Sequence, residues 1–492
     1  MLNNALTIEY RNTNDLKPYL DNPHIHSRRQ LDKLKNGLGR FGQITPIIID
    51  RDDTIVDGEA VWKAWTALGA EQIAVIVAPS RDEAEIRAIR LALNRIPEEA
   101  GWDKARLKLE FEDLLKIGFD MDLTGFDTVE IDMALAIDEP GSGALEDAPP
   151  GPGAGPAMAQ AGDIWILGRH RLACGDCRDV ALTDRLMAGA TARMSFADPP
   201  YNVVIDGNAV GKGRHREFAF GSGEMSTAEF TVFLAEALLS IWLRLVDGGV
   251  AFCCMDWRHV EETCAAARAV GFTVINLCVW TKTNPGMGSL YRSQHELVFV
   301  LKKGEAPHVN NVELGKQGRS RSNVWTYRGM SSFGADRDEL LGAHPTVKPV
   351  ALAADAIKDV SGRGDLVFDP FLGSGTTLIA AHRTGRRCFG VELDPLYVDV
   401  ILSRWEAETG REPQLPAGTR WPGRSPRRRW RCRRPPCAFS AHRAGRAKPW
   451  PTTSATTRWA TGARHSIAAS NGASPATRAG DRAGSRTSSP TS

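Results

Sequence analysis

The sequence predicts an α/β protein whose larger folded unit is a mainly parallel sheet with helices on both faces. Three observations support this fold class. Short apolar runs end in polar or glycine-rich segments, helical spacing fills several of the intervals between them, and the two most distinctive polar motifs each follow directly after such a run. A length of 492 residues is too great for one ordinary core, so two or three domains are expected.

A smaller α/β domain is predicted for residues 1–138. Its expected elements are strands at 45–50, 54–56 and 73–77 and helices at 60–68 and 82–93. Residues 139–161 are rich in Pro, Gly and Ala and offer few groups able to build a core. This segment is therefore expected to be a linker.

The larger unit is predicted to span residues 162–412. Its expected strands are 194–197, 250–254, 366–368 and 388–391, and its clearest helical patterns are 227–245 and 376–384. After residue 412, arginine runs and Ser/Thr/Ala/Gly stretches show no helical or strand periodicity, so residues 413–492 are expected to be a disordered basic tail. About 16 of the 61 Lys and Arg residues lie after Gln414, which leaves the preceding part acidic despite a net charge of +2. Contacts with nucleic acid must then come from local basic patches.

No segment has the character of a membrane span or a secretory signal. The richest apolar stretch, 230–255, is interrupted by Glu236, Arg244 and Asp247, and the first residues lack a basic lead and an apolar block. Nine cysteines without a framework spacing fit reduced thiols. A cytoplasmic location is expected.

The motif Asp198-Pro199-Pro200-Tyr201 follows directly after an apolar run and is the strongest candidate for a catalytic site. An amino group on a base ring is a poor nucleophile because its lone pair is delocalised. A carboxylate at 198 and the carbonyl of the next proline can each accept a hydrogen bond from that group and favour a pyramidal, reactive nitrogen. Tyr201 can stack on a base turned out of the duplex. A plain strand-to-turn transition is the alternative explanation of these four residues.

A second motif, residues 369–377, follows another apolar run and opens a helix. Its glycines let the backbone approach a ligand, and the helix start offers free N–H groups. The absence of a following Lys excludes a P-loop, and a third glycine of the dinucleotide fingerprint is missing. Glu392 ends the next apolar run, where nucleotide-binding sheets place the acid that holds ribose hydroxyls.

Residues 162–410 resemble the amino-group DNA methyltransferases of the circularly permuted β class. The resemblance rests on five elements in the order of that class: 175–176, 198–201, 344–349, 369–377 and Glu392. It implies S-adenosyl-L-methionine as the cofactor, double-stranded DNA as the partner, a restriction–modification setting and a possible homodimer. An Asp at position 198 resembles the members that modify adenine.

The resemblance also implies roles for individual residues. Asp176 would contact the adenine of the cofactor, Thr346 and Lys348 its methionine end, and Glu392 its ribose. The residues that would line the cofactor pocket are Asp369, Phe371, Gly373, Ser374, Gly375 and Thr376.

Two segments between the motifs have the composition of DNA-contacting loops, 206–225 and 310–328. Their candidate DNA-binding residues are Lys212, Arg214, Arg216, Lys316, Arg319 and Arg321. Cations position phosphates, and Arg, Asn and Gln read base edges. Ordinary solvated loops would have a similar composition.

The N-terminal domain resembles the ParB-like domains fused to such methyltransferases. The matching motifs are 22–23, 41–46, 94–96 and 101–103. Where nucleotide-binding relatives carry Gly-Glu-Arg-Arg, this chain has Gly58-Glu59-Ala60-Val61, so a phosphate contact is missing and neither CTP binding nor a nuclease role is expected. A DNA-positioning or interaction role is the expectation.

Several alternatives stay open at this point. The chain could be a non-catalytic, ParB-like DNA-binding adaptor, or its enzyme could modify the cytosine amino group or RNA. No metal site is expected, because Cys174 and Cys177 lack a second pair at ligand spacing. Cys253 and Cys254 lie in an apolar run and are expected to be core residues.

Overall fold

The computed structural model describes residues 6–78, 82–136, 155–203, 223–283, 290–312, 321–327 and 348–416. The chain divides into two units, residues 1–432 and 433–492, and every described residue lies in the first. The predicted basic tail lies outside the described residues from position 417 onward.

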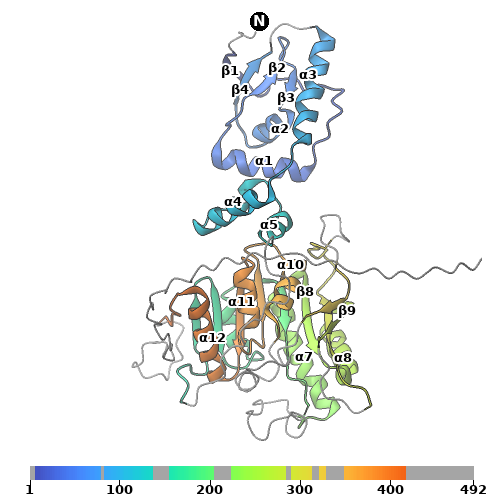
Figure 1. Ribbon diagram of the computed structural model, residues 1–492, viewed down its shortest axis with the longest axis vertical. Coiled ribbons are helices and arrows are strands. Elements are labelled where there is room, and N and C mark those ends of the chain that lie inside the picture. Colours follow the sequence, from blue (N-terminus) through green and yellow to red (C-terminus); the bar gives the residue numbers. More distant parts are fainter. Residues whose placement is uncertain are drawn as a thin grey trace, which may run out of the picture. The chain divides into compact units, whose positions relative to one another are not determined.

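A four-stranded sheet in the order β1-β4-β2-β3 organises the first domain (Figure 1). Its elements are β1 (Ile8–Asn12), α1 (Arg28–Phe41), β2 (Ile47–Ile49), β3 (Ile55–Asp57), α2 (Glu59–Ala67), β4 (Gln72–Val77), α3 (Glu83–Arg95) and the 3₁₀ turn η1 (Ile96–Glu99). Strands β2 and β4 run parallel, and the other two pairs are antiparallel. Alternate residues of β2 and β4 point into one small core, whose buried members are Leu16, Ile47, Ile49, Ile55, Ile73 and Val75.

The start of α2 explains the Gly58-Glu59-Ala60-Val61 sequence locally. Gly58 has a φ of +88°, and a Cβ there would lie 2.5 Å from Cγ2 of Ile47, so only glycine fits. The carboxylate of Glu59 accepts a hydrogen bond from Asn22 at 2.6 Å and pairs with Lys63 at 2.6 Å. Ala60 is buried. The side chains of Glu59 and Ala60 therefore make their contacts within the domain.

A short helical segment follows, built from α4 (Lys104–Lys116), the 3₁₀ turn η2 (Met121–Thr124) and α5 (Thr128–Leu135). Its own core consists of Phe111, Met121, Ile131 and Ala134. Asp127 caps α5 in a capping box with Glu130. The same Asp127 carboxylate lies 2.8 Å from Arg29 and 2.7 Å from Lys33, both on α1. Ion pairs therefore hold the start of α5 to α1.

The larger domain is a nine-stranded sheet in the order β11-β9-β10-β8-β7-β12-β13-β6-β5. Its strands are β5 (Ile164–Leu167), β6 (His170–Cys174), β7 (Ala192–Ala197), β8 (Leu245–Met255), β9 (Thr273–Thr281), β10 (His295–Lys302), β11 (Val324–Thr326), β12 (Leu366–Asp369) and β13 (Arg387–Glu392). The five central strands, from β8 to β6, are parallel to one another. Antiparallel pairs attach β10 and β9 on one side and β5 on the other.

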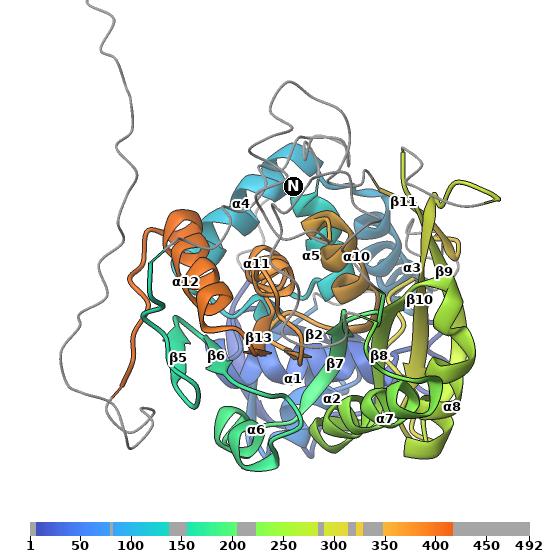
Figure 2. The same ribbon diagram turned by 90° about the horizontal axis from the view of Figure 1, so that it is seen from below.

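Helices cover both faces of this sheet, as Figure 2 shows. The helices are α6 (Val180–Met187), α7 (Thr227–Arg244), α8 (Val260–Val270), α10 (Val350–Val360), α11 (Thr376–Arg383) and α12 (Pro395–Thr409), with the 3₁₀ turn η3 (Trp257–His259) before α8. Apolar residues of α6, α7 and α8 form one core with the sheet, and those of α10, α11 and α12 form the other. The predicted fold class is confirmed. None of the helices within the described residues is both long and apolar enough to cross a membrane.

The larger domain extends slightly past both ends of its predicted range. The backbone N–H groups of Met158 and Ala159, in the predicted linker, donate to the carboxylate of Asp399 at 2.6 and 3.0 Å, and Ala159 is buried. After residue 412, Gln414 pairs with Ile166 of β5. The chain therefore joins the core before residue 162 and still packs against it at Leu415.

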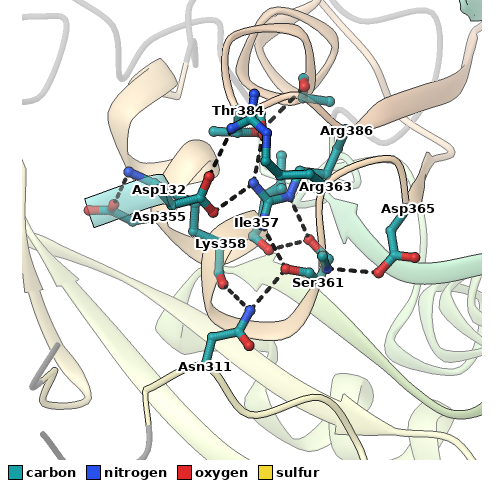
Figure 3. A network of polar contacts seen from close by, with 12 residues as sticks. Asp132, Asn311, Asp355, Ile357, Lys358, Ser361, Arg363, Asp365, Thr384 and Arg386 are labelled. Atoms are coloured by element: carbon teal, nitrogen blue, oxygen red, sulfur yellow. Dashed lines mark hydrogen bonds and ion pairs between the residues drawn. The ribbon is translucent and has the colours of Figure 1, made fainter. Parts of the chain in front are cut away.

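A network of buried polar groups joins α5 to the larger domain (Figure 3). The two carboxylate oxygens of Asp132 on α5 accept hydrogen bonds from Arg386 at 2.8 Å and Arg363 at 2.9 Å. Arg386 is fully buried and also donates to the backbone carbonyls of Ser361 and Thr384. Asn311 reaches the end of α10 from another side and donates to the carbonyl of Ser361 at 2.9 Å. The end of α10 therefore connects α5, the sheet and the segment around residue 311.

Candidate active site

Four acidic residues follow or end neighbouring parallel strands of the large sheet. They are Asp176 after β6, Glu392 at the end of β13, Asp369 at the end of β12 and Asp198 after β7. These four strands are adjacent in the order β7-β12-β13-β6. The carboxyl ends of adjacent parallel strands lie at one edge of the sheet. The structure therefore brings both predicted motifs, which are more than 170 residues apart in sequence, to the same edge.

The carboxylate of Asp198 is held by two neighbouring side chains. Nζ of Lys348 lies 2.6 Å from its Oδ2, and the hydroxyl of Tyr201 donates to its Oδ1 at 2.9 Å. Lys348 lies just before α10, and its ammonium group also donates to the hydroxyl of Tyr201 at 3.1 Å. The resemblance placed Lys348 at the methionine end of the cofactor, whereas here its Nζ is bonded to the predicted catalytic carboxylate.

Glu296, at the start of β10, completes this cluster and was not predicted from the sequence. Its Oε2 lies 2.9 Å from the hydroxyl of Tyr201, as an alternative acceptor to Asp198, and 3.1 Å from Nζ of Lys348. Its Oε1 accepts from Nζ of Lys282 at 2.5 Å. Two carboxylates and the ammonium group of Lys348 thus surround the hydroxyl of Tyr201, and Lys282 contacts the other oxygen of Glu296.

The pKa values of these groups are shifted by burial and by one another. Burial raises the pKa of Asp198 above its usual value, although Lys348 opposes the rise. Burial also raises the pKa of the Tyr201 hydroxyl. For Glu296, burial is outweighed by Lys348 and Lys282, which lower its pKa to about 2. Burial alone would lower the pKa of Lys348, but Asp198 and Glu296 outweigh it and the pKa is raised. At neutral pH the cluster therefore holds an ionised Glu296, a charged Lys348 and a neutral Tyr201.

The glycine-rich loop between β12 and α11 lies at the same edge of the sheet, because β12 is the strand next to β7. Oδ1 of the buried Asp369 accepts the backbone N–H of Phe371 at 2.9 Å, and burial raises the pKa of Asp369 to about 7. Gly375 caps α11 with a φ of +87°, and a Cβ there would lie 3.2 Å from the side chain of Ile401. Ser374 and Thr376 are buried. The loop therefore brings bare backbone and a helix N-terminus to the site.

Glu392 links this loop to the end of β13. Its Oε2 accepts the backbone N–H of Gly373 at 2.7 Å, and its Oε1 accepts the backbone N–H of Asp394 at 2.9 Å. Its backbone carbonyl accepts the N–H of Gly175, which precedes Asp176. Burial raises the pKa of Glu392 to about 7. A single acid thus fixes the relative positions of three strand-end loops.

Asp176 is held in an ion pair. Arg178 donates to both of its carboxylate oxygens, with Nη2 2.8 Å from Oδ2, and a second bond joins Arg178 to Glu236. Burial opposes the charged form of Asp176, but the hydrogen bonds from Arg178 outweigh it, so its pKa lies below the usual value. Asp176 therefore presents an ionised carboxylate at the edge.

Most predicted DNA contacts lie outside the described residues, as does Thr346. Those contacts are Lys212, Arg214, Arg216, Lys316 and Arg319. Arg321 is described: its Nη1 lies 2.8 Å from Asp355, its Nε lies 3.1 Å from Asp359, and its side chain is 16% exposed. The charge of Arg321 is thus already paired within the domain, and its DNA-binding role stays a prediction.

The four cysteines considered in the sequence lie inside the larger domain. Cys253 and Cys254 are buried in β8, and burial raises the pKa of both thiols. Cys174 and Cys177 are buried, free thiols. Within the described ranges, no group of three or more His, Cys, Asp or Glu side chains is placed to hold a metal ion.

Comparison with known protein families identifies this part of the chain. Residues 192–403 match the family model described as DNA methylase, and residues 105–161 match the model described as ParB-methyltransferase HTH domain. Residues 192–403 belong to the DNA methylase family. The methylase range begins with β7, contains both polar motifs and ends within α12, and the HTH range includes α5 and all but the first residue of α4. The resemblance inferred from the motifs is confirmed.

Individual relatives agree with the family. The type II methyltransferase M2.DpnII of Streptococcus pneumoniae is 29% identical over 230 residues, which cover 44% of this chain and 82% of the relative. M2.MboI of Moraxella bovis is 25% identical over 225 residues, which cover 44% and 81%. Among solved structures, a Thermus thermophilus protein described as a putative DNA modification methylase, complexed with S-adenosyl-L-methionine, is 24% identical with a TM-score of 0.34, covering 49% of this chain and 94% of that one.

The residues at the sheet edge fit S-adenosyl-L-methionine, the cofactor that the resemblance implies. Each carboxylate oxygen of Glu392 accepts one backbone N–H, which leaves further acceptor capacity for the ribose hydroxyls of a nucleoside. Gly375 keeps the loop free of a side chain that would meet Ile401. An acid at one strand end and a glycine loop at the next form the donor and acceptor set that a nucleoside with a charged tail needs.

Proposed function

We propose that this protein is a DNA methyltransferase that transfers the methyl group of S-adenosyl-L-methionine to the exocyclic amino group of adenine. One observation carries the proposal: the Asp198–Tyr201 motif after β7 lies at the same sheet edge as the glycine loop of β12 and Glu392 of β13. A base held at the first motif and a donor held at the second would meet there. When bound, S-adenosyl-L-methionine supplies an electrophilic methyl group.

The side chains of the motif orient and activate the base. The carboxylate of Asp198 and the carbonyl of Pro199 accept hydrogen bonds from the amino group, so its lone pair points away from the ring. Two successive prolines, Pro199 and Pro200, lack N–H groups and keep the loop stiff. Tyr201 lies three residues after Asp198 with its hydroxyl anchored, which leaves its ring to stack on the extruded base.

The cofactor residues are proposed from the same arrangement. Glu392 would hold the ribose, Asp176 the adenine of the cofactor, and Phe371, Gly373, Ser374, Gly375 and Thr376 would form the wall beside Asp369. Lys348 would act on the carboxylate of Asp198, to which it is bonded, and Thr346 keeps its predicted place at the methionine end.

The wider setting is proposed in coarser terms. A substrate of double-stranded DNA and a cytoplasmic location are proposed with support from the methylase family match, and the ParB-like domain would position the DNA. A homodimer is proposed on the family resemblance alone, and light scattering on the full-length protein tests it. The six loop cations, Lys212, Arg214, Arg216, Lys316, Arg319 and Arg321, are the proposed DNA contacts.

Replacement of Asp198 tests the catalytic assignment. The variant Asp198→Ala should lower methyl transfer to unmethylated bacterial DNA by at least about 10³-fold, because it removes the acceptor that activates the amino group. Its affinity for S-adenosyl-L-methionine, measured by calorimetry, should stay within about threefold of the wild type. Near-normal transfer by Asp198→Ala would contradict the assignment, and a wild-type protein that neither binds the cofactor nor transfers methyl would favour the adaptor alternative.

A further inference from the structure

The hydroxyl of Tyr201 lies at equal distances from two carboxylates. Oδ1 of Asp198 and Oε2 of Glu296 are each 2.9 Å from it. A phenol has one hydrogen, so it donates to only one of these oxygens at a time. Its lone pair is used by Lys348, whose Nζ donates to it at 3.1 Å.

The three hydrogens of the Lys348 ammonium group match the acceptors around it. Its neighbours are Oδ2 of Asp198 at 2.6 Å, Oε2 of Glu296 at 3.1 Å and the hydroxyl of Tyr201 at 3.1 Å. The side chain is only 4% exposed, so water does not replace these partners. Lys348 therefore stays fixed whichever carboxylate receives the hydrogen of Tyr201.

The base and Tyr201 compete for the same carboxylate. Lys348 donates to Oδ2 of Asp198, and Oδ1 is one of the two oxygens to which the hydroxyl of Tyr201 can donate. A target amino group that bonds to Oδ1 needs this hydrogen to turn elsewhere. Glu296 offers an acceptor that is already at hydrogen-bond distance and already charged.

We propose that Glu296 is a positioning residue for methyl transfer, which receives the hydroxyl hydrogen of Tyr201 and so frees Oδ1 of Asp198 for the amino group of the target base. This inference rests on the proposed function and adds a residue to it. Lys282 holds Glu296 in place through the other carboxylate oxygen at 2.5 Å. Without Glu296, Asp198 is the acceptor that remains for the hydroxyl hydrogen of Tyr201 among its described contacts, and this hydrogen blocks the position that the base needs.

A double-mutant cycle between Glu296 and Tyr201 tests the proposal. The variant Glu296→Gln removes the charged acceptor, and Tyr201→Phe removes the competing hydroxyl while it keeps the ring. Single-turnover transfer from tritiated S-adenosyl-L-methionine to unmethylated bacterial DNA is measured for the wild type, both single variants and the double variant. Glu296→Gln should slow transfer by at least about tenfold with cofactor affinity within about threefold, and its effect in the Tyr201→Phe background should be at least about fivefold smaller.

The matched control is Glu408→Gln. Glu408 pairs with Arg383 at the ends of α11 and α12 that lie away from the strand-end loops, and its loss should leave the transfer rate unchanged. If Glu296→Gln fails to fold, Glu296→Asp replaces it in the cycle, because the shorter carboxylate withdraws from Tyr201 and keeps the charge.

The outcomes separate the two proposals. A loss from Glu296→Gln that is equal in both backgrounds, or no loss at all, overturns the role of Glu296. An inactive wild-type protein overturns the proposed function instead.

Discussion

The carboxylate of Asp132, on α5 of the HTH segment, is bonded to the fully buried guanidinium group of Arg386 in the methylase domain at 2.8 Å. The two residues are 254 positions apart in sequence. Arg386 also donates to the carbonyls of Thr384 and Ser361, so its direction is fixed from within the methylase domain. Asp132 supplies the counter-charge that this buried cation requires. The HTH segment is therefore part of what stabilises the methylase domain.

Removal of the charge of Asp132 should destabilise the protein. The variant Asp132→Asn keeps the shape but leaves the guanidinium groups of Arg386 and Arg363 without this anionic partner, and breaking a buried ion pair from one side costs about 3–5 kcal/mol. Urea unfolding followed by tryptophan fluorescence measures the change. Asp122→Asn, an exposed position in the same segment, is the matched control and should change the unfolding free energy by less than about 0.5 kcal/mol. Equal stabilities of the two variants would contradict the role given to Asp132.

Loss of the Lys348 ammonium group should move the pH profile of methyl transfer. Lys348 lowers the pKa of Asp198 against the effect of burial, so Lys348→Met should raise that pKa further. If transfer needs an ionised Asp198, the acid limb of the pH–rate profile moves to higher pH by at least about one unit. At a fixed pH on that limb, the variant is then about tenfold slower than the wild type. Lys358→Met, which removes one of the partners of Asp355 farther along α10, should leave the limb in place. An unmoved limb in Lys348→Met would show that Lys348 does not control the ionisation of Asp198.

Cofactor affinity should rise with pH through about 7. Burial raises the pKa of Glu392 to about 7 in the absence of cofactor, and ribose hydroxyls bond more strongly to the ionised carboxylate. Affinity is therefore lower below that pKa and increases as Glu392 loses its proton, as calorimetry between about pH 5.5 and 8.5 would measure. Glu392→Gln should bind more weakly and with a smaller pH dependence. Burial also raises the pKa of Asp369 to about 7. The variant Asp369→Asn therefore measures how much of the pH dependence of cofactor affinity comes from Asp369. A wild-type affinity that does not change over this range would contradict the role of Glu392.

Gly375→Ala should weaken cofactor binding as well as stability. The residue has a φ of +87°, which costs an alanine about 1–2 kcal/mol, and its Cβ would lie 3.2 Å from Ile401. Gly410→Ala provides the control, because Gly410 has a φ of +66° and its Cβ would meet nothing within 4 Å. Both variants should lose stability in thermal unfolding, and only Gly375→Ala should also lose affinity for S-adenosyl-L-methionine, by about tenfold. Equal affinities of the two variants for S-adenosyl-L-methionine would show that the loop at Gly375 is not part of the cofactor site.

The sequence predicted the edge of the sheet that carries the site because parallel strands follow a simple rule. Asp198, Asp369 and Glu392 each come at the carboxyl end of an apolar run, and such ends meet when the strands are parallel neighbours. The predicted elements of both domains also correspond to strands and helices of the structure, with ends that differ by a few residues; β8 begins five residues before its prediction.

Glu296 was missed because it reaches the same edge by a different route. It lies at the amino end of β10, and an acid at the start of an apolar run usually only faces solvent. The antiparallel pairing of β10 with β8, which places Leu297 opposite Met255, turns this amino end toward the carboxyl ends of the parallel strands. Lys282 arrives through the antiparallel pairing of β9 with β10. Strand order and direction of this kind depend on long-range packing, as does the pairing of Asp132 with Arg386.

The identity of the methylated nucleoside is the most direct test of the central claim. DNA from a strain without base methylation is incubated with the full-length protein and S-adenosyl-L-methionine, digested to nucleosides and analysed by mass spectrometry. The account predicts N6-methyldeoxyadenosine, which is absent when Asp198→Ala replaces the wild type. N4-methyldeoxycytidine as the product, or an equal yield of methylated adenine from the Asp198→Ala variant, would contradict it.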